Sequence, residues 1–414
     1  MTHRVVIVGA GFAGLNAAKR LRQAPVAITI IDRSNYHLFQ PLLYQVATGG
    51  LSPADIASPI RYILRRQKNV RVILDTVTDV DVDHKSVTTT SGLIPYDTLI
   101  VATGATHHYF GHDEWETSAP GLKTLRDATG IRASILEAFE HAERSHSPDS
   151  LNFLVIGGGP TGAEMAGTIA EMARDTLRRD FRAIDPRTAR VILVEAGPAV
   201  LPAFAGDLSN RAALQLAKLG VEVRTNWQAT AISGDSVTMT DGTTSETIHA
   251  ASIVWAAGVS GSPLGAQLVG RDGLDRSGRV MVSDQLTVPG HPEVFVLGDL
   301  AHAVSEARPV PGVAPAAIQA GRYAADTIVD RMEGRTPPVF TYRNKGTMAT
   351  IGRRSGVAEL GKLRLHGWPA WMAWLVVHLW FLIGFENRLL VLTQWAWNYV
   401  TRNRSARLII RYRD

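Results

Sequence analysis

The chain has 414 residues, which is too long for one ordinary hydrophobic core and predicts two or three domains. Hydrophobic residues make up 45% of it and charged residues 20%, a balance typical of a chain that is folded throughout. Cysteine is absent, which excludes structural disulfides, thiolate metal sites, thiol catalysis and attachment of a cofactor through sulfur.

The formal net charge of +5 is concentrated toward the carboxyl end. Residues 360–414 contain eight Arg or Lys and two acidic residues, so the preceding part of the chain is close to neutral. The same segment holds six of the nine Trp. This combination favours an anionic membrane surface over nucleic acid as a partner, because no basic stripe runs along the rest of the chain. No cleavable signal precedes the first strand, so the amino-terminal domain is expected to stay in the cytoplasm.

The first predicted element is an apolar strand over residues 4–8, followed by Gly9, Gly11 and Gly14 and then by an Ala-rich helix. A second strand ends at Asp32, which is 18 residues beyond the last of these glycines. That spacing is close to the ~20 residues that separate the glycine loop from the acidic residue in a dinucleotide-binding fingerprint. A strand, a glycine turn, a helix and an acid in this order predict a Rossmann fold.

The same pattern returns in the middle of the chain. A strand over residues 151–156 leads into Gly157, Gly159 and Gly162, and the strand after the next helix ends at Glu195. The gap of 33 residues between the last glycine and this acid exceeds the usual ~20. We attribute the excess to a lengthened helix, reaching about residue 182, and its polar loop.

Three later strands are also predicted to be buried and to end in small residues: 96–105, 251–261 and 293–302. The chain is therefore expected to leave its first domain near Gly104, build a second domain, and return to complete the first. The predicted fold class is α/β, with two Rossmann-like dinucleotide-binding domains, the second inserted in the first, and a carboxy-terminal amphipathic helical region for membrane docking. In chain order, the expected segments are residues 1–113, 114–262, 263–335 and 336–414.

The glycine loops explain what such a fold would bind. Glycine allows a tight turn and lets the backbone approach a pyrophosphate, which then meets unpaired amides at the positive end of the following helix. Two loops predict two dinucleotides. Asp32 and Glu195 would each accept hydrogen bonds from a ribose 2′-hydroxyl and repel a 2′-phosphate, so the second nucleotide is expected to be NADH and not NADPH. Arg33 complicates this interpretation at the first loop, although a flavin dinucleotide carries no 2′-phosphate.

Two further features fit a flavin. Gly298 and Asp299 follow a buried strand and look like the contact to a ribityl chain, with a capped turn as the alternative. Pro315 suits the first turn of a helix that runs to about Ile328. If the amino end of this helix points at the flavin ring, its dipole favours the reduced form. Simple packing of an Ala-rich helix is the alternative.

The carboxy-terminal region contains two apolar segments. Residues 368–385 carry no formal charge and are just long enough to be a spanning candidate, but Trp occurs along their whole length and favours a helix lying in the interface. His378, within this segment, is interpreted as a packed or interfacial residue. A core or dimer-interface role of both helices stays an alternative. The second segment, 389–400, precedes five arginines suited to anionic headgroups, namely Arg402, Arg404, Arg407, Arg411 and Arg413.

These motifs resemble the two-dinucleotide-binding-domain flavoproteins, and within them the type II (alternative, non-proton-pumping) NADH:quinone oxidoreductases. The resemblance covers nearly the whole chain. It is carried by NYHLFQPLLYQVATGGL at 35–51, by GGGPTGAEMAG, VWAAGV and GDLAH, and by ATIGRRSGVAELG and FENRLLVLTQWAWNYV in the tail. It implies an enzyme that transfers two electrons from NADH through non-covalent FAD to a membrane quinone without pumping protons. It also implies peripheral or monotopic attachment to the cytoplasmic face of a bacterial inner membrane.

The resemblance also implies site residues. For FAD these are the pyrophosphate loop, the adenosine ribose contacts, an adenine-side contact, a strand-end glycine, the ribityl contact and a ring contact: Gly9, Ala10, Gly11, Phe12, Ala13 and Gly14; Asp32 and Arg33; Val77; Gly104; Asp299; Ala314. For NADH they are Gly157, Gly159, Gly162, Glu195 and Gly258. No metal site is predicted.

Two residues are candidates for the chemistry itself. Glu164 matches a family glutamate placed between the nicotinamide and quinone sites and could assist proton delivery, although an acid in a first helical turn can simply complement the helix dipole. Gln319 matches the second glutamine of an A-Q-x-A-x-Q type motif that lines the quinone pocket, while Pro315 stands where the first glutamine is expected. The Gln319 amide could bond a quinone carbonyl or be an ordinary helix-surface group.

Other flavoproteins with this architecture suggest alternative functions. Disulfide reductases and sulfide:quinone reductases share this architecture but need redox-active thiols, which this chain lacks. A soluble NADH-dependent flavin reductase that passes electrons to a protein acceptor is the nearest alternative enzyme. A flavin-binding redox sensor without turnover is an alternative of another class. A second copy of the chain is an open partner.

Overall fold

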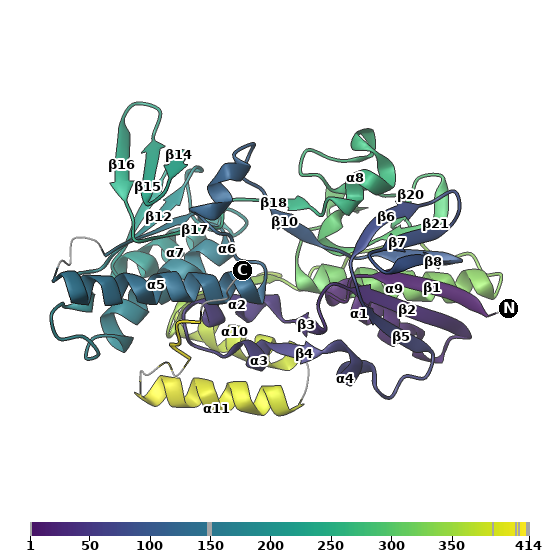
Figure 1. The fold of residues 1–414 in the computed structure, drawn as a ribbon, viewed down its shortest axis with the longest axis horizontal. Coiled ribbons are helices and arrows are strands. Elements are labelled where there is room, and N and C mark those ends of the chain that lie inside the picture. Colours follow the sequence, from purple (N-terminus) through teal and green to yellow (C-terminus); the bar gives the residue numbers. More distant parts are fainter. Residues whose placement is uncertain (1, 147–150, 383–384, 402–403, 405, 411–414) are drawn as a thin grey trace. The chain divides into compact units, whose positions relative to one another are not determined.

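The structure is a computed structural model that describes residues 2–146, 151–382, 385–401, 404 and 406–410. The chain folds into two compact units, each assembled from separate segments (Figure 1). Unit 1 comprises Met1–Leu38, Ala57–Thr106 and Val259–Lys345. Unit 2 comprises Phe39–Ile56, His107–Gly258 and Gly346–Asp414. The second unit thus includes a short early excursion of the chain and the carboxy-terminal region, while the domain borders expected from the sequence stay a prediction.

Unit 1 is built on a six-stranded sheet in the order β20-β21-β9-β1-β2-β5. Its strands from β21 to β5 run parallel, and β20 pairs antiparallel at one edge. Buried β-branched side chains on the central strands suit a parallel sheet that is covered on both faces. The bounds are β1 (His3–Val8), β2 (Val26–Asp32), β5 (Val70–Leu74), β9 (Thr98–Val101), β20 (Thr287–Val288) and β21 (His291–Val296).

Helices α1 (Phe12–Arg20) and α9 (Ala314–Met332) pack on each other in unit 1. Small residues allow this approach, since a Cβ on Gly321 would overlap the Ala13 carbonyl oxygen. The remaining elements of unit 1 are short: β3 (Tyr36–Leu38), β4 (Ala57–Pro59), α4 (Ile60–Leu64), β6 (Val77–Asp81), β7 (Ser86–Thr89), β8 (Gly92–Pro95), β18 (Val259–Gly261), α8 (Leu264–Val269), β19 (Val280–Met281), β22 (Ala301–His302), β23 (Val304–Ser305) and β24 (Arg308–Pro309).

Unit 2 is built on a four-stranded parallel sheet in the order β13-β12-β11-β17. Its longest helix, α5, begins with a reciprocal capping box between Thr124 and Asp127. The bounds are α5 (Leu125–Ser145), β11 (Asn152–Ile156), α6 (Pro160–Glu171), β12 (Arg190–Glu195), α7 (Gly206–Lys218), β13 (Val221–Thr225) and β17 (Ser252–Trp255). A three-stranded antiparallel sheet precedes β17, with β14 (Gln228–Ser233), β15 (Ser236–Thr240) and β16 (Ser245–His249).

The prediction of a helix reaching about residue 182 is wrong. Helix α6 ends at Glu171, continues through one π-helical turn over Met172–Thr176, and gives way to irregular chain. The residues that follow, Arg178 to Arg182, are mostly exposed and offer no apolar stripe for a helix to bury. The long gap before Glu195 is therefore filled by the rest of α6, the π-helical turn, a loop over 177–189 and most of β12.

The carboxy-terminal part of unit 2 forms a three-stranded antiparallel sheet followed by two helices, drawn in yellow-green and yellow in Figure 1. Its elements are β25 (Thr347–Gly352), β26 (Ser355–Leu360), β27 (Leu363–His366), α10 (Trp368–Phe381) and α11 (Phe385–Thr401). The early excursion adds α2 (Leu43–Ala47) and α3 (Pro53–Ile56). Across the part of the chain that the structure describes, no helix combines the length and the apolar character needed to cross a membrane.

Candidate functional site: two nucleotide cradles and a cavity

The loop between β1 and α1 in unit 1, here called the first cradle, is a tight backbone turn. Gly9 has a φ of +95°, and a Cβ there would overlap the Ala102 carbonyl oxygen. A Cβ on Gly14 would overlap the Gly9 carbonyl oxygen, so only glycine fits either position. At Gly11, in contrast, a Cβ would meet no atom within 4 Å. This side of the loop is open, and no side chain caps the first amides of α1.

The loop between β11 and α6 in unit 2, the second cradle, repeats this geometry. Gly157 has a φ of +109°, and a Cβ there would overlap the backbone at Ala256. A Cβ on Gly162 would overlap the Gly157 carbonyl oxygen, and a Cβ on Gly159 would meet nothing within 4 Å. No side chain caps the start of α6. Both cradles therefore present free helix-end amides in an open space, which is the arrangement that binds a pyrophosphate.

Asp32 closes the first cradle at the end of β2. Its carboxylate accepts hydrogen bonds from the backbone amides of Ala10 at 2.6 Å and Ser34 at 2.7 Å. Burial raises the pKa of Asp32, while these two bonds and the nearby exposed Arg33 act in the opposite direction. A carboxylate has about four acceptor positions, so Asp32 keeps capacity for a ribose hydroxyl.

Glu195 occupies the corresponding place at the end of β12. One carboxylate oxygen accepts from the amide of Gly158 at 2.6 Å, and the other accepts from the amide of Gly197 at 2.7 Å. The side chain therefore holds the second cradle in shape and also presents a negative charge beside it. That charge opposes a 2′-phosphate at this position.

The ribityl-side residues of unit 1 gather beside the first cradle. A Cβ on Gly298 would lie 3.6 Å from the Ala317 Cβ on α9 and 3.7 Å from the Ala13 Cβ on α1. Asp299 follows in a short 3-10 turn, and a Cβ on Gly312 would lie 3.3 Å from its Oδ1. Gly298 thus joins the start of α1, the end of β21 and the first turns of α9 at one place. Such a cradle, with a carboxylate beyond it and a helix end beside it, fits FAD.

The remaining predicted cofactor residues lie within their expected units. In unit 1, Val77 begins β6 and packs partly buried against the sheet core, Gly104 adopts a φ of +69°, and Ala314 is the first residue of α9. In unit 2, the Gly258 carbonyl accepts a hydrogen bond from the His108 amide at 3.2 Å. Their contacts with nucleotides stay a prediction.

Gln319 is held at both ends of its amide. Its nitrogen donates to the Arg343 carbonyl oxygen and its oxygen accepts from the Arg343 amide, each at 3.0 Å. The side chain therefore ties α9 to the segment before β25. A bond from Gln319 to a quinone would have to replace one of these two contacts.

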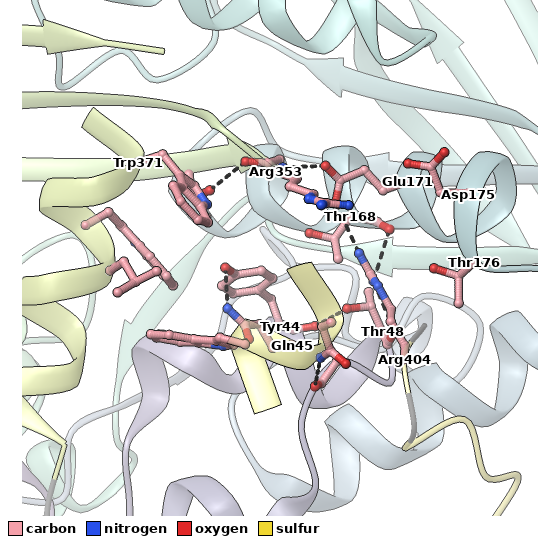
Figure 2. Close-up of a pocket in the computed structure, with 17 residues that line it drawn as sticks. Tyr44, Gln45, Thr48, Thr168, Glu171, Asp175, Thr176, Arg353, Trp371 and Arg404 are labelled. Atoms are coloured by element: carbon pink, nitrogen blue, oxygen red, sulfur yellow. Dashed lines mark hydrogen bonds and ion pairs between the residues drawn. The ribbon is translucent and has the colours of Figure 1, made fainter. Parts of the chain in front are cut away.

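Unit 2 also contains a cavity of about 140 Å³, shown in Figure 2. Its walls come from α2 and the turn after it, from α6 and the following π-helical turn, from β25, from α10 and α11, and from residue 404. The lining residues are Tyr44, Gln45, Thr48, Gly50, Thr168, Glu171, Asp175, Thr176, Thr350, Gly352, Arg353, Trp371, Trp374, Leu375, Trp395, Asn398 and Arg404.

One wall of the cavity is aromatic. Trp374 and Trp395 have ring centroids 5.7 Å apart, and the Tyr44 ring meets Trp374 edge-on at 6.3 Å. The Trp395 indole nitrogen donates to the Gln45 side-chain oxygen at 2.8 Å, and the Gln45 nitrogen donates to the Tyr44 hydroxyl at 2.9 Å. Behind this wall His378 stacks on Trp374 and burial lowers its pKa to about 4, which confirms the packed role expected for it.

The opposite wall is charged. Glu171 and Arg404 form an ion pair at 3.1 Å, with side chains that are only 14% and 13% exposed, and Figure 2 shows them pointing toward one another. The Arg404 guanidinium also donates to the carbonyl oxygens of Thr48 at 3.2 Å and Thr168 at 3.3 Å. The interpretation of Arg404 as a headgroup contact is wrong, because a buried acid 233 positions earlier in the chain attracts it inward.

Of the other four tail arginines, the structure describes one. Arg407 pairs with Asp180, an exposed acid of unit 2. Arg402, Arg411 and Arg413 lie outside the described residues.

Burial sets the charge states around the cavity. It raises the pKa of Glu164 to about 8, against a smaller opposing effect of a hydrogen bond from the Thr350 backbone. Burial also raises the pKa of Glu171, and the charge of Arg404 lowers it. The Tyr44 pKa lies well above its ordinary value because of burial, and because the charges of Glu164 and Glu171 both disfavour its anion.

Comparison with known proteins connects this geometry to an activity. The family described as pyridine nucleotide-disulphide oxidoreductase matches residues 3–321. The type II NADH:quinone oxidoreductase NdhA of Mycobacterium tuberculosis is 49% identical, over 97% of this chain and 88% of that relative. The chain belongs to the type II NADH:quinone oxidoreductase family. Another relative of that description, from Staphylococcus haemolyticus, is 31% identical over 86% of this chain and 89% of its own length.

Solved structures show that the fold is shared with this family. NDH2 from Plasmodium falciparum in complex with NADH has a TM-score of 0.89 at 19% identity, covering 99% of this chain and 100% of that chain. The sulfide:quinone oxidoreductase of Aquifex aeolicus has a TM-score of 0.76 at 18% identity, covering 98% and 93%. Thiol chemistry cannot be shared by this chain, because it has no cysteine.

Several residues around the cavity were missed by sequence reasoning, which singled out Glu164 near it and assigned Arg404 to lipid headgroups. Glu164, Thr168, Glu171 and Asp175 recur at helical spacing along one face of α6 and the turn that follows. That spacing was the available signal. Tyr44 stands within the stretch that resembles type II NADH:quinone oxidoreductases, but no local pattern announces that it faces a cavity.

Proposed function

We propose that this type II NADH:quinone oxidoreductase binds NADH at the second cradle and FAD at the first, and reduces a quinone that enters the cavity of unit 2. The duplicated cradle is the observation that carries the proposal. Each copy has the same strained glycine, the same open glycine at a helix start, and a carboxylate that accepts from the loop amides.

FAD held at the first cradle would supply the redox chemistry, hydride acceptance from NADH and two-electron reduction of the quinone. The chain supplies positions and charges. Gly11 and Gly159 leave room for pyrophosphates, and the first amides of α1 and α6 stabilise their negative charge. Asp32 and Glu195 accept the ribose hydroxyls, and we infer that Glu195 selects NADH over NADPH.

The quinone is assigned to the cavity on the chemistry of its walls. Trp374 and Trp395 offer flat apolar faces to a ring, and the Tyr44 hydroxyl lies in the same wall, joined to Trp395 through Gln45. The Asn398 side-chain oxygen is buried and has no hydrogen-bond partner among the described residues. It is therefore an acceptor suited to a quinol hydroxyl or to a water molecule.

Gln319 is the second candidate for quinone contact, because it matches the second glutamine of the A-Q-x-A-x-Q type motif. Steady-state kinetics separate the two assignments. Trp374→Ala is expected to raise the quinone KM about tenfold, since removing an aromatic contact costs about 1 kcal/mol or more. Gln319→Ala is expected to leave it within twofold. The reverse pattern would move the quinone from the cavity to α9.

Membrane association is proposed from the exposed surface of α10 and α11. Large apolar side chains stand exposed along both helices: Trp368, Val376, Trp380, Phe381, Leu389, Leu390, Leu392 and Trp397. An exposed apolar patch of this kind marks an interaction surface, and the abundance of Trp suits the interfacial layer of a bilayer. We infer that the protein docks peripherally through these helices on the cytoplasmic face of a bacterial inner membrane.

Purified protein in detergent tests the proposed function. The expected result is a flavin spectrum and quinone-dependent oxidation of NADH at least tenfold faster than that of NADPH. Equal rates with both nucleotides would contradict the role of Glu195. If the protein oxidises NADH with an artificial acceptor but reduces none of the quinones assayed, its acceptor is instead a protein.

A further inference from the structure

We propose that the Tyr44 hydroxyl is the group that donates a hydrogen bond and then a proton to a quinone in the unit 2 cavity, and that acids along α6 restore this proton. The inference rests on the proposed function and names a further catalytic residue for it. It begins from the geometry around Tyr44, which the motifs of the two cradles do not involve.

The hydrogen bonds around Tyr44 leave its proton available. The Gln45 amide nitrogen donates to the Tyr44 oxygen at 2.9 Å, and Gln45 is itself oriented by the indole of Trp395 at 2.8 Å. Gln45 thus occupies an acceptor position of the hydroxyl and leaves the O–H bond to point elsewhere. Because Tyr44 lines the cavity and is only 5% exposed, a ring lying against Trp374 is a suitable acceptor for that bond.

Acids stand beside Tyr44 on a single helix. Glu164 and Glu171 are seven positions apart on one face of α6, and the charges of both act on the Tyr44 hydroxyl. Asp175, one turn further on, is exposed and also lines the cavity. The volume of about 140 Å³ has room for several water molecules. Tyr44, Glu171 and Asp175 all line the cavity, so water in it would connect the surface at Asp175 with Tyr44.

The charged and titratable groups facing this route come from each neighbouring element. Those that line the cavity are Tyr44 on α2, Glu171 and Asp175 on α6 and its following turn, Arg353 after β25 and Arg404 after α11. Glu164 on α6 acts on Tyr44 through its charge, and His378 on α10 packs behind Trp374. Arg404 pairs with Glu171 and favours its ionised form, whereas burial keeps Glu164 protonated up to a pKa of about 8. Glu164 is therefore the proton store next to Tyr44 at neutral pH.

The proton balance of the reaction requires such a donor. NADH, one proton and quinone yield NAD⁺ and quinol, so NADH supplies both electrons and the hydride hydrogen, and solvent supplies one proton per turnover. In the proposed step the Tyr44 O–H bond breaks as a quinol O–H bond forms. Tyr44 then takes the proton of Glu164, and Glu164 regains one from water through Glu171 and Asp175. Because burial raises the pKa of Tyr44, its proton is expected to pass only to a strongly basic acceptor, the anion of the reduced quinone.

Tyr44→Phe tests the proposal by removing one hydroxyl and keeping the ring. Its kcat with a water-soluble quinone is expected to fall about 10²-fold, the range for losing a general acid. The rate with ferricyanide, which accepts electrons without protons, and the flavin content are expected to stay within twofold. Tyr62→Phe is the matched control, because Tyr62 is 49% exposed on α4 of unit 1, and both rates should be unchanged.

Two further readouts separate chemistry from packing. With quinone, kcat of the unchanged chain should slow in D₂O and should fall above about pH 8 as Glu164 loses its proton. With ferricyanide neither effect is expected. In Glu164→Gln, the kcat that remains with quinone should no longer fall above pH 8. These measurements on the unchanged chain and Glu164→Gln decide the matter even if Tyr44→Phe does not fold.

Three results would overturn the inference. Tyr44→Phe could keep its quinone kcat within threefold, or lose activity equally with both acceptors, or raise only the quinone KM while the fall above pH 8 persists. A different result would overturn the proposed function itself. In that case the unchanged chain reduces ferricyanide with NADH but reduces no quinone.

Discussion

Glu164 and Glu171, two acids on one face of α6, illustrate how the partners of a carboxyl group decide its charge. Glu171 has a guanidinium at 3.1 Å, whereas Glu164 receives a hydrogen bond from the Thr350 backbone. A buried carboxylate is costly unless a cation or several donors compensate it. The two acids therefore serve differently, Glu171 holding Arg404 in place and Glu164 holding a proton.

The stability of the protein should depend on Glu164 and on pH. Its folded pKa of about 8 lies above the ordinary value of 4.5. The unfolded chain therefore releases this proton first, and the stability contributed by the protonated group is complete below pH 4.5 and is lost as pH rises to about 8. Glu164→Gln is expected to raise the free energy of unfolding at pH 8 by a few kcal/mol, at about 1.4 kcal/mol per pKa unit, with little effect near pH 5. Urea unfolding at both pH values measures this, and an equal change at both would refute it.

Nucleotide choice should depend on Glu195. Glu195→Ala removes the acceptor of a charge-assisted hydrogen bond, a loss of about 1.5–3 kcal/mol. The KM for NADH is expected to rise by about tenfold or more, and the preference over NADPH to shrink, with the flavin content unchanged. Glu246→Gln, which alters a half-exposed acid on β16 of the same unit, is the control. An unchanged NADH:NADPH ratio in Glu195→Ala would exclude this residue from recognition.

At the scale of elements, each cradle separates glycines that shape the fold from glycines that leave space for a ligand. Gly162 belongs to the first kind, because a Cβ there would overlap the Gly157 carbonyl oxygen. Gly159 belongs to the second, because a Cβ there would meet nothing within 4 Å. The strand, turn and helix around them follow from local pattern, since the spacing of glycines and apolar residues is set by the elements themselves.

Paired substitutions test that separation. Gly159→Ala is expected to leave the melting temperature nearly unchanged but to weaken NADH binding at least tenfold, because its methyl group occupies the space proposed for the pyrophosphate. Gly162→Ala is expected to destabilise unit 2 by roughly 1–3 kcal/mol, the usual cost of forcing extra volume into a packed site. Thermal unfolding and NADH titration of the flavin signal measure both. Normal NADH affinity in Gly159→Ala would remove the nucleotide from this loop.

The elements also show what sequence could and could not predict. Both glycine loops, both acids and the two tail helices were predicted, because each depends on residues close together in the chain. The end of α6 was not predicted, because the helix ends where its residues cease to pack against the rest of unit 2. The buried position of the Arg404 side chain was not predicted either, because its partner Glu171 lies far away in sequence. The cavity depends on such distant pairings, and so its lining could not be anticipated from the sequence.

At the scale of the whole molecule, α10 and α11 combine an exposed apolar surface with a wall of the cavity. Trp380 on α10 and Trp397 on α11 are 73% and 64% exposed. The same helices contribute Trp374 and Trp395 to the cavity wall. One pair of helices thus offers an apolar face outward and lines the cavity inward, which would deliver a lipid-soluble quinone directly from the bilayer to its site.

Membrane docking can be removed without touching the cavity. The double variant Trp380→Glu and Trp397→Glu is expected to lower partitioning onto vesicles with anionic lipid by about 10²-fold, since two large apolar groups at ~25 cal/mol per Å² are replaced by charges. Ferricyanide reduction should persist. Val339→Glu, at a residue 56% exposed in unit 1, is the control. Undiminished binding of the double variant would place the membrane contact elsewhere.

The central claim is that one cradle holds a flavin that NADH reduces and a quinone reoxidises. Anaerobic stopped-flow absorbance of the purified protein tests it most directly. One equivalent of NADH should bleach the flavin band, one equivalent of quinone should then restore it, and NADPH should bleach it far more slowly. A protein without a flavin band that cannot be reconstituted with FAD, or a reduced band that quinone fails to restore, would contradict the account.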